Sequence, residues 1–139
     1  MAYPNNPSKE TKKFKTLLVE DSIPFRQLLK ENLHDRFPSM LLEEAGDGIE
    51  AMQKLDSVCP DLIFMDIRLP GESGLELTKK IKSQCPDIKI IIMTSYDLPE
   101  YREGAKKAGA NYFLTKDKTS WEEVAKLVNS ISAEIGKPI

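Results

Sequence analysis

The sequence has few of the residues that mark secreted, membrane or metal-cluster proteins. Only two of its 139 residues are cysteines, and Cys59 and Cys85 stand far apart without a C-x-x-C or zinc spacing, so we expect free thiols near helix ends. No apolar run is long enough to cross a membrane, and the polar stretch 1–15 contains no signal-peptide core. These absences predict a cytoplasmic protein.

The single histidine and the small net charge exclude further classes. His34 sits among polar residues of a helical pattern, which indicates a solvated side chain rather than a metal ligand or a triad member. The net charge of −2 gives no basic footprint, so we expect no direct nucleic-acid binding by this domain and no membrane contact. A P-loop is absent, and Glu20-Asp21 stands where a flavin-binding protein would need a phosphate loop.

Five short segments predict the strands of one sheet. Four of them are nearly continuous apolar runs, which are typical of parallel strands that helices cover on both faces. The strands are expected at 16–19, 41–45, 62–66, 89–93 and 112–114.

Helical patterns follow each of these strands. The first helix runs from Pro24 to Phe37, with Ser22 or Asp21 as its cap, and Leu28 widens its apolar stripe. The fourth, at 99–108, has little apolar anchorage, which suits a movable element. Two overlapping capping boxes open the last helix: Thr119 with Glu122, and Ser120 with Glu123.

Repeated alternation of strand and helix predicts an α/β fold with right-handed crossovers. We expect a doubly wound five-stranded parallel sheet of order 2-1-3-4-5, a flavodoxin-like (βα)5 arrangement. Residues 1–13 are predicted to form a flexible N-terminal tail, and residues 14–136 a single domain.

Acidic side chains follow the first and third strands, at the edge of the sheet where sites of such folds lie. Glu20 and Asp21 end the first strand, and Asp66 ends the third. Oxygen ligands of this kind suit Mg²⁺, and the backbone carbonyl of Arg68 would lie close by. Clustered carboxylates repel one another unless a cation joins them. The sequence therefore predicts a magnesium site.

The remaining polar residues at this edge suit phosphoryl transfer. An aspartate such as Asp66 can accept a phosphoryl group covalently. Lys116 offers a compact positive charge, and the Thr94 hydroxyl offers a hydrogen bond, which are the contacts that such a transfer needs. Taken alone, Asp66 would be a turn or cap residue, and Lys116 a surface lysine. Their joint placement at strand ends favours a shared site.

At this point the chain resembles the receiver domain of two-component response regulators. The resemblance covers 14–135, nearly everything but the tail. It is carried by LLVEDS at 17–22, DLIFMDIRLPGESGLEL at 61–77, IIMTSYD at 91–97 and KAGANYFLTKD at 107–117.

The resemblance implies a role for each matching residue. Asp66 would accept phosphate from a histidine of a sensor kinase or phosphotransfer protein, and Glu20 and Asp21 would hold Mg²⁺ with it. Thr94 would swing toward the phosphoryl group, and Lys116 would pair with it.

Four further positions carry roles that the resemblance implies. Ser95 is small and would leave room for phosphate. Phe113 occupies the position of the switch aromatic, although β-propensity alone would make it an ordinary strand residue. Arg68 and Tyr96 occupy positions that tune the rates of phosphorylation and dephosphorylation.

Two residues depart from the common pattern of the family. Asp117 replaces the proline that often follows the lysine, as in receivers that precede a LuxR-type helix-turn-helix, so a cis bond is not expected there. Phe113 replaces the frequent tyrosine, so the switch would depend on packing without a hydroxyl contact.

The predicted function is a phosphorylation-dependent signalling switch of a bacterial two-component phosphorelay, relayed through the face of helix 99–108, strand 112–114 and the last helix. It would act on itself, by phosphoryl transfer and autodephosphorylation, and would not be a conventional enzyme. Its other partners would be an unknown downstream protein and a second copy in a phosphorylation-dependent homodimer. The alternative is a phosphorylation-independent interaction module of the same fold, and a phosphatase with Asp66 as nucleophile ranks lower because Arg68 replaces the second acid.

The sequence leaves the output of the switch open. The complete last helix favours a receiver that stands alone, whereas the Lys116-Asp117 pair favours one joined to a DNA-binding domain. The cognate kinase, the stimulus, the oligomeric state and the lifetime of the phosphoryl group are not encoded in any motif.

Overall fold

Ten elements alternate along the part of the chain that the computed structural model describes, residues 13–139. The predicted flexible tail therefore lies outside the described residues, apart from Lys13. The elements are β1 (Lys15–Val19), α2 (Ile23–Arg36), β2 (Leu41–Ala45), α3 (Gly48–Val58), β3 (Leu62–Met65), α4 (Gly74–Gln84), β4 (Lys89–Thr94), α5 (Pro99–Ala108), β5 (Tyr112–Thr115) and α6 (Trp121–Ile135).

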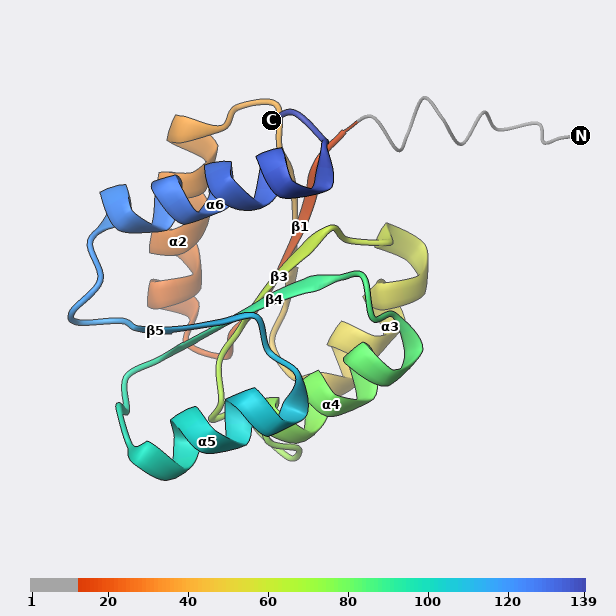
Figure 1. Ribbon diagram of the computed structural model, residues 1–139, viewed down its shortest axis with the longest axis vertical. Coiled ribbons are helices and arrows are strands. Elements are labelled where there is room, and N and C mark those ends of the chain that lie inside the picture. The colour runs from red at the N-terminus through yellow and green to blue at the C-terminus, as the bar shows by residue number, and fades with distance from the viewer. Residues whose placement is uncertain (1–12) are drawn as a thin grey trace, which may run out of the picture.

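The strands form one parallel sheet in the order β2-β1-β3-β4-β5, which confirms the predicted doubly wound topology. Figure 1 shows α2 and α6 on one face of this sheet and α3, α4 and α5 on the other. β2 lies on one side of β1, and the later strands β3, β4 and β5 lie on the other, so the strand order reverses at β1. In such sheets the crevice at the carboxyl ends of these strands is the place for a site.

The central strands carry two cores, one on each face of the sheet. Successive residues of a strand point to opposite faces, so Leu18 and Phe64 pack under α2 and α6 while Leu17 and Ile63 pack under α3 and α4. All four are at most 2% exposed. This burial on both sides explains why the strands appear in the sequence as continuous apolar runs.

Strand boundaries differ from the predicted ones by one residue. β3 ends at Met65, and the carboxylate of the next residue, Asp66, accepts a hydrogen bond from the Ile67 backbone N–H at 2.8 Å. β4 and β5 each extend by one residue, since Thr94 pairs with Thr115 in the parallel ladder. The residue after each strand still lies at the carboxyl edge.

Leu28 does not widen the buried stripe of α2, so that prediction was wrong. Its side chain is 45% exposed, whereas Leu29 and Leu33 are buried. Successive helical residues are rotated by about 100°, so Leu28 turns away from the sheet and faces a surface groove beside the start of α6. The first helix is otherwise as expected, with Ser22 as its cap.

Of the two capping registers predicted for α6, the structure uses the second. The Ser120 hydroxyl accepts from the Glu123 N–H at 3.1 Å, and the Glu123 carboxylate accepts from the Ser120 N–H at 2.8 Å. Each partner satisfies a backbone donor that the helix itself leaves free. The cap fixes where α6 begins, next to the carboxyl edge of the sheet.

Gly74 allows α4 to begin directly against the end of β3. A Cβ atom at this position would lie 1.9 Å from the Asp66 carbonyl oxygen and 3.0 Å from the Ile67 Cα, both parts of the backbone. The Gly74 N–H also donates to the Ile67 carbonyl at 2.8 Å. The loop that follows Asp66 is therefore held tightly against the first turn of α4.

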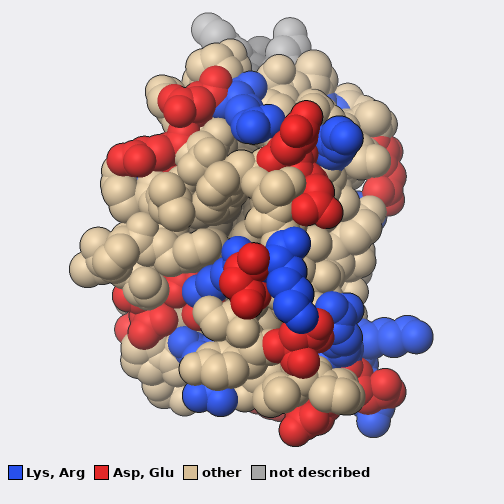
Figure 2. Space-filling view, turned by 90° about the vertical axis from the view of Figure 1, so that its left-hand side faces the viewer, with Lys and Arg blue, Asp and Glu red and all other residues tan. Residues whose placement is uncertain are grey.

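The remaining sequence expectations concern surface residues. Cys59 and Cys85 are free and end α3 and α4, and His34 is exposed, as predicted. None of the helices in residues 13–139 is long and apolar enough to cross a membrane. On the face shown in Figure 2, basic and acidic side chains are interspersed over the lower half, and an uncharged area lies left of the centre.

Candidate functional site

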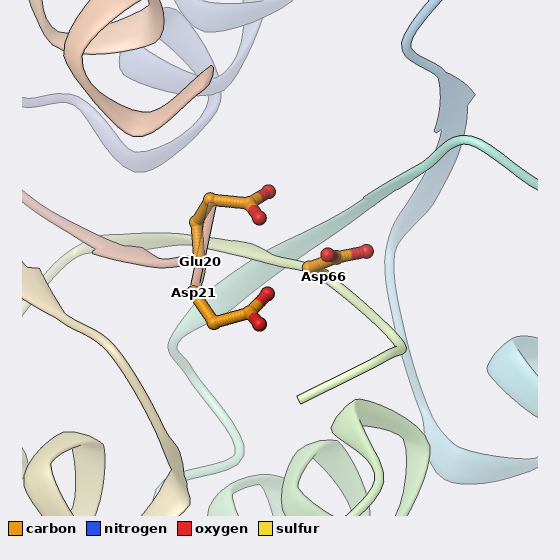
Figure 3. Close-up of side chains that lie close together, drawn as sticks. All are labelled: Glu20, Asp21 and Asp66. Carbon is orange, nitrogen blue, oxygen red and sulfur yellow. The ribbon is translucent and has the colours of Figure 1, made fainter. Parts of the chain in front are cut away.

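Three carboxylates meet at the carboxyl edge of the sheet. Glu20 and Asp21 follow β1, Asp66 follows β3, and one oxygen of each lies within 4.8 Å of the others. In Figure 3 the side chains of Glu20 and Asp21 both extend toward the side of β1 on which Asp66 lies. The structure thus brings together the acidic residues that the sequence placed at two separate strand ends.

Backbone pairing fixes how these residues face one another. The Asp66 N–H donates to the Val19 carbonyl, and the Glu20 N–H donates to the Ala45 carbonyl, each at 3.0 Å. The ladder of β2, β1 and β3 therefore continues one residue beyond the strands. Glu20 is 4% exposed and Asp66 7%, whereas Asp21 is exposed. Two of the acids are fixed in the protein and the third faces solvent.

Lys116 completes the cluster from β5. Its Nζ lies 2.7 Å from Glu20 Oε1 and 3.4 Å from Asp66 Oδ2. Its backbone N–H donates to the Thr94 carbonyl at 2.9 Å, which anchors the residue to the end of β4. A single ammonium thus bridges the two buried carboxylates from the opposite side of the crevice.

The electrostatics of Glu20 reflect this crowding. Burial is the main reason that the pKa of the Glu20 carboxyl is raised above its ordinary value, and the charge of Asp66 adds to the rise. The hydrogen bonds from Lys116 and from the Ser22 backbone N–H oppose it. The pocket carries more negative charge than one lysine compensates, which is the condition that favours a bound cation.

The set of donors fits a hard divalent cation. Carboxylate oxygens from Glu20, Asp21 and Asp66 stand close enough to share one ion, and an exposed Asp21 leaves room for water ligands. Mg²⁺ prefers oxygen ligands and usually keeps several waters, so one or two carboxylates are enough to hold it.

The predicted hydroxyl lies at the end of β4. Thr94 is fully buried, and its Oγ1 accepts a long hydrogen bond of 3.4 Å from the Tyr96 N–H. Ser95 beside it is exposed. The Arg68 guanidinium lies 3.9 Å from the centre of the Tyr96 ring, so the two predicted rate-tuning side chains touch each other. They lie on the exposed rim of the site.

Phe113 is half-buried in β5, and a basic side chain covers its ring. The Arg102 guanidinium lies 4.6 Å from the ring centre. Arg102 is itself paired with Asp97 in the loop before α5. The predicted switch aromatic is therefore linked to α5 through a cation–π contact.

Two residues of α2 contribute to the site without having been predicted. The Phe25 ring lies 4.3 Å from Lys116 Nζ, and Arg26 Nη1 donates to the Glu20 carbonyl at 2.7 Å. A positive charge near a helix N-terminus is unfavourable because it opposes the helix dipole. The position of Arg26 in the sequence could therefore have indicated that its guanidinium binds an acceptor nearby. For Phe25, nothing in the sequence distinguishes it from an ordinary member of the apolar stripe.

A groove of about 480 Å³ opens beside Lys116, between α2 and the start of α6. Phe25, Leu28 and Trp121 give it an apolar lining, and Lys116 marks its end at the acidic cluster. The groove leads from the surface toward the phosphoryl site that the sequence predicted.

Comparison with known sequences gives one family over most of the chain. The response regulator receiver domain matches residues 16–129. The chemotaxis protein CheY of Halobacterium salinarum is 39% identical over 100 residues, which cover 72% of this chain and 82% of that protein. The oxygen regulatory protein NreC of Staphylococcus carnosus is 36% identical over 104 residues, 74% of this chain but only 48% of NreC. The chain thus spans about half the length of NreC.

Solved structures agree with the sequence comparison. A LuxR-family two-component response regulator from Aurantimonas sp. SI85-9A1 superimposes with a TM-score of 0.78 at 28% identity, over 88% of this chain and 86% of that one. A CheY-like receiver domain from Methanospirillum hungatei JF-1 gives a TM-score of 0.80 at 24% identity, over 91% and 99% of the two chains, a likeness of fold.

Proposed function

The chain belongs to the response regulator receiver domain family, and on that premise we propose that it is a switch that accepts a phosphoryl group on Asp66. The observation that carries the proposal is the cluster of Glu20, Asp21 and Asp66, with oxygens within 4.8 Å of one another and the Lys116 ammonium 3.4 Å from Asp66. Receiver domains are signalling modules, so the reaction changes the protein itself.

The donor is a phosphohistidine of a sensor kinase or of a phosphotransfer protein. An Asp66 oxygen attacks the phosphorus, the O–P bond forms, and the N–P bond breaks with the electron pair returning to the imidazole. Mg²⁺, held by Glu20, Asp21, Asp66 and the Arg68 carbonyl, would neutralise charge on the phosphoryl oxygens. Lys116, already beside Asp66, pairs with the new charge without a large movement.

The groove beside Lys116 supports docking of the donor protein. Phe25, Leu28 and Trp121 offer an apolar surface between α2 and the start of α6, next to the acceptor. Together these side chains form a contiguous apolar patch, with Leu28 45% exposed, and such a patch suits a docked partner. A histidine carried on the surface of the donor would then reach Asp66 from this side.

The signal then passes to the face formed by α5, β5 and α6. We propose that the Thr94 hydroxyl exchanges its long bond with Tyr96 for one to the phosphoryl group, and that Phe113 then turns inward. Ser95 leaves room for the phosphoryl oxygens. Ala105 is the only buried side chain of α5, so this helix moves at little cost. The change is a shift between two packings of one fold.

Loss of the phosphoryl group resets the switch by autodephosphorylation. Arg68 and Tyr96 stack on each other at the rim, and we propose that this pair controls how easily water reaches the phosphorus.

The names of the relatives support a proposal for the output. NreC is named an oxygen regulatory protein, and others among the relatives are named transcriptional regulators. We propose that this domain works in the cytoplasm and controls an attached or separate output protein, by a phosphorylation-dependent homodimer or by binding a downstream protein.

One experiment tests the core of this proposal. Purified protein is incubated with Mg²⁺ and acetyl phosphate, and its intact mass is measured. We expect one acid-labile phosphate in the wild type and in Asp56→Asn, an exposed control, and none in Asp66→Asn. Repeated hydrolysis of phosphate esters without a stable adduct would favour a phosphatase. Partner binding that ignores both Asp66→Asn and Mg²⁺ would favour the phosphorylation-independent module.

A further inference from the structure

The Lys116 ammonium has a third neighbour besides the two carboxylates. Its Nζ lies 4.3 Å from the centre of the Phe25 ring, in addition to 2.7 Å from Glu20 Oε1 and 3.4 Å from Asp66 Oδ2. A cation within about 6 Å of an aromatic ring centre is attracted by the negative face of the ring. Lys116 is therefore held between two anions and one aromatic face.

The aromatic contact differs from the other two in that nothing competes for it. A cation in the acidic cluster draws on the oxygens of Glu20 and Asp66, and a phosphoryl group on Asp66 changes the anion that faces the lysine. The ring of Phe25 accepts no metal and no proton. It thus keeps one contact with Lys116 constant while the charges around the lysine change.

The surroundings of Phe25 hold its ring in place. Its backbone N–H donates to the Ser22 hydroxyl at the cap of α2, and its ring stacks on Trp121 with centres 6.1 Å apart at 29°. Trp121 is the first residue of α6, directly after the N-cap Ser120. The ring is therefore supported from the starts of two helices.

The contact is largely shielded from water, although the groove of about 480 Å³ reaches both Phe25 and Lys116 from the surface. Phe25 lines a small internal gap with Glu20, Asp66 and core side chains, and this gap has no room for a water molecule. The Lys116 side chain is only 13% exposed. A cation–π contact gains strength when its cation is desolvated, so this one has more influence than a surface contact would.

We propose that Phe25 is a positioning residue for the phosphoryl-transfer reaction: its ring face holds the Lys116 ammonium where the phosphoryl group on Asp66 will lie. The inference rests on the proposed function for its role in transfer, but the contact itself is independent of it. Trp121, the only tryptophan of the chain, stacks on the Phe25 ring and helps to hold it in place.

The first test needs neither metal nor phosphoryl donor. The proton shifts of the Lys116 side chain are measured by NMR in the wild type and three variants. We expect an upfield ring-current shift in the wild type, in Phe25→Tyr and in the exposed control Ile49→Ala, and its loss in Phe25→Leu. An unshifted Lys116 in the wild type overturns the proposal.

The second test measures the rate of phosphorylation by acetyl phosphate. Phe25→Leu should lower it by about three- to tenfold, as expected for loss of a partly buried cation–π contact, and Phe25→Tyr should restore it. In a Lys116→Met background, Phe25→Leu should have no further effect. Equal losses in both backgrounds, or failure of Phe25→Tyr to rescue, would show that Phe25 matters only for packing.

The two tests separate this inference from the proposed function. If wild-type protein never gains a phosphate but the Lys116 shift depends on Phe25, then the positioning contact stands and the switch function fails. If phosphate is gained normally in Phe25→Leu, then the function stands and the positioning role is overturned. Circular dichroism of each variant establishes that it is folded.

Discussion

The charge of Glu44 links a strand to a helix close to the site. Its carboxylate accepts from Arg26 Nε at 3.0 Å and from Lys30 Nζ at 2.8 Å, so it ties β2 to α2. Arg26 in turn donates to the Glu20 carbonyl. The bonds with Lys30 are the main reason that the pKa of Glu44 is lowered below its usual 4.5, with Arg26 adding to the effect.

This pKa predicts how stability depends on pH. A carboxyl whose pKa is lowered by folding contributes its full stabilisation above its unfolded pKa. As the pH falls, the unfolded state takes up the proton first, so this stabilisation is lost by the time the pH has passed below the folded pKa. Glu44→Gln should lower the free energy of unfolding by about 1 kcal/mol at pH 7, the upper range for a partly exposed pair. The difference from wild type should shrink below pH 4.5 and vanish below the lowered pKa.

Urea denaturation at several pH values checks this expectation. Glu43→Gln is the matched control, since Glu43 is the neighbouring residue on the exposed side of β2. Within residues 13–139 it pairs with one cation, Lys54, at 3.7 Å. An effect of Glu44→Gln that is the same at pH 3 and pH 7 would contradict the electrostatic account.

Single residues differ in how far the sequence identified them. Asp66, Glu20 and Lys116 could be predicted because a strand end in a parallel sheet has a known place, whatever the surrounding packing. Phe25 and Leu28 could not be assigned, because a helical stripe gives the angle of a side chain but not what lies opposite it. The partner across the groove, Trp121, is almost a hundred residues away in sequence.

At the scale of elements, the start of α6 offers a choice that the sequence left open. Thr119 and Ser120 both begin a capping-box pattern, and only Ser120 makes the two reciprocal bonds. Ser120→Ala should cost about 1 kcal/mol of stability, as loss of an N-cap usually does. Thr119→Ala should cost much less. Thermal unfolding of both variants checks this, and equal losses would mean that the cap is shared.

The α5 helix and β5 are joined by the contact between Arg102 and Phe113. Because the guanidinium lies on the ring face, it favours the present position of the ring over the inward position that we propose for the activated switch. Arg102→Leu should raise the population of the inward ring by about two- to fivefold, since an exposed cation–π contact is weak. Glu103→Gln, exposed on the same helix, should not change it.

NMR line shapes and chemical shifts of the Phe113 ring, without phosphorylation, measure that population. An unchanged ring signal in Arg102→Leu would show that neighbouring side chains, and not the arginine, hold the ring.

The sequence indicated that α5 is weakly anchored, but it did not show the reason for Gly104: a Cβ there would lie 2.9 Å from the Leu75 side chain of α4. The glycine permits close packing of the two helices.

For the whole molecule, the acidic cluster links cation binding to stability. A ligand that binds only the folded state adds about 2.7 kcal/mol at roughly 100 times its Kd. If Mg²⁺ occupies the cluster, then it should raise the Tm by several degrees in the wild type. Asp21→Asn should shift the response to higher Mg²⁺ concentrations. Calorimetry with Mg²⁺ and with Na⁺ at equal ionic strength checks this, and an equal effect of both salts would exclude a specific site.

The overall topology was predictable because it depends on features that repeat five times. Four of the five strands are nearly continuous apolar runs, and each helix returns the chain to the same edge, so errors of one residue at Asp66 or Thr94 did not change the sheet order. Side-chain contacts between distant elements have no such redundancy. They were the part that only the structure supplied.

The contact between Gly74 and the backbone of Asp66 has a consequence for how this chain tolerates change. Every other amino acid carries a carbon that would collide with the acceptor's own carbonyl oxygen. In a library of random point variants, codon 74 would be as restricted as codon 66, although it contributes no atom to the reaction. Gly71, three residues earlier, has open space around it and would accept residues that tolerate a left-handed backbone, such as asparagine.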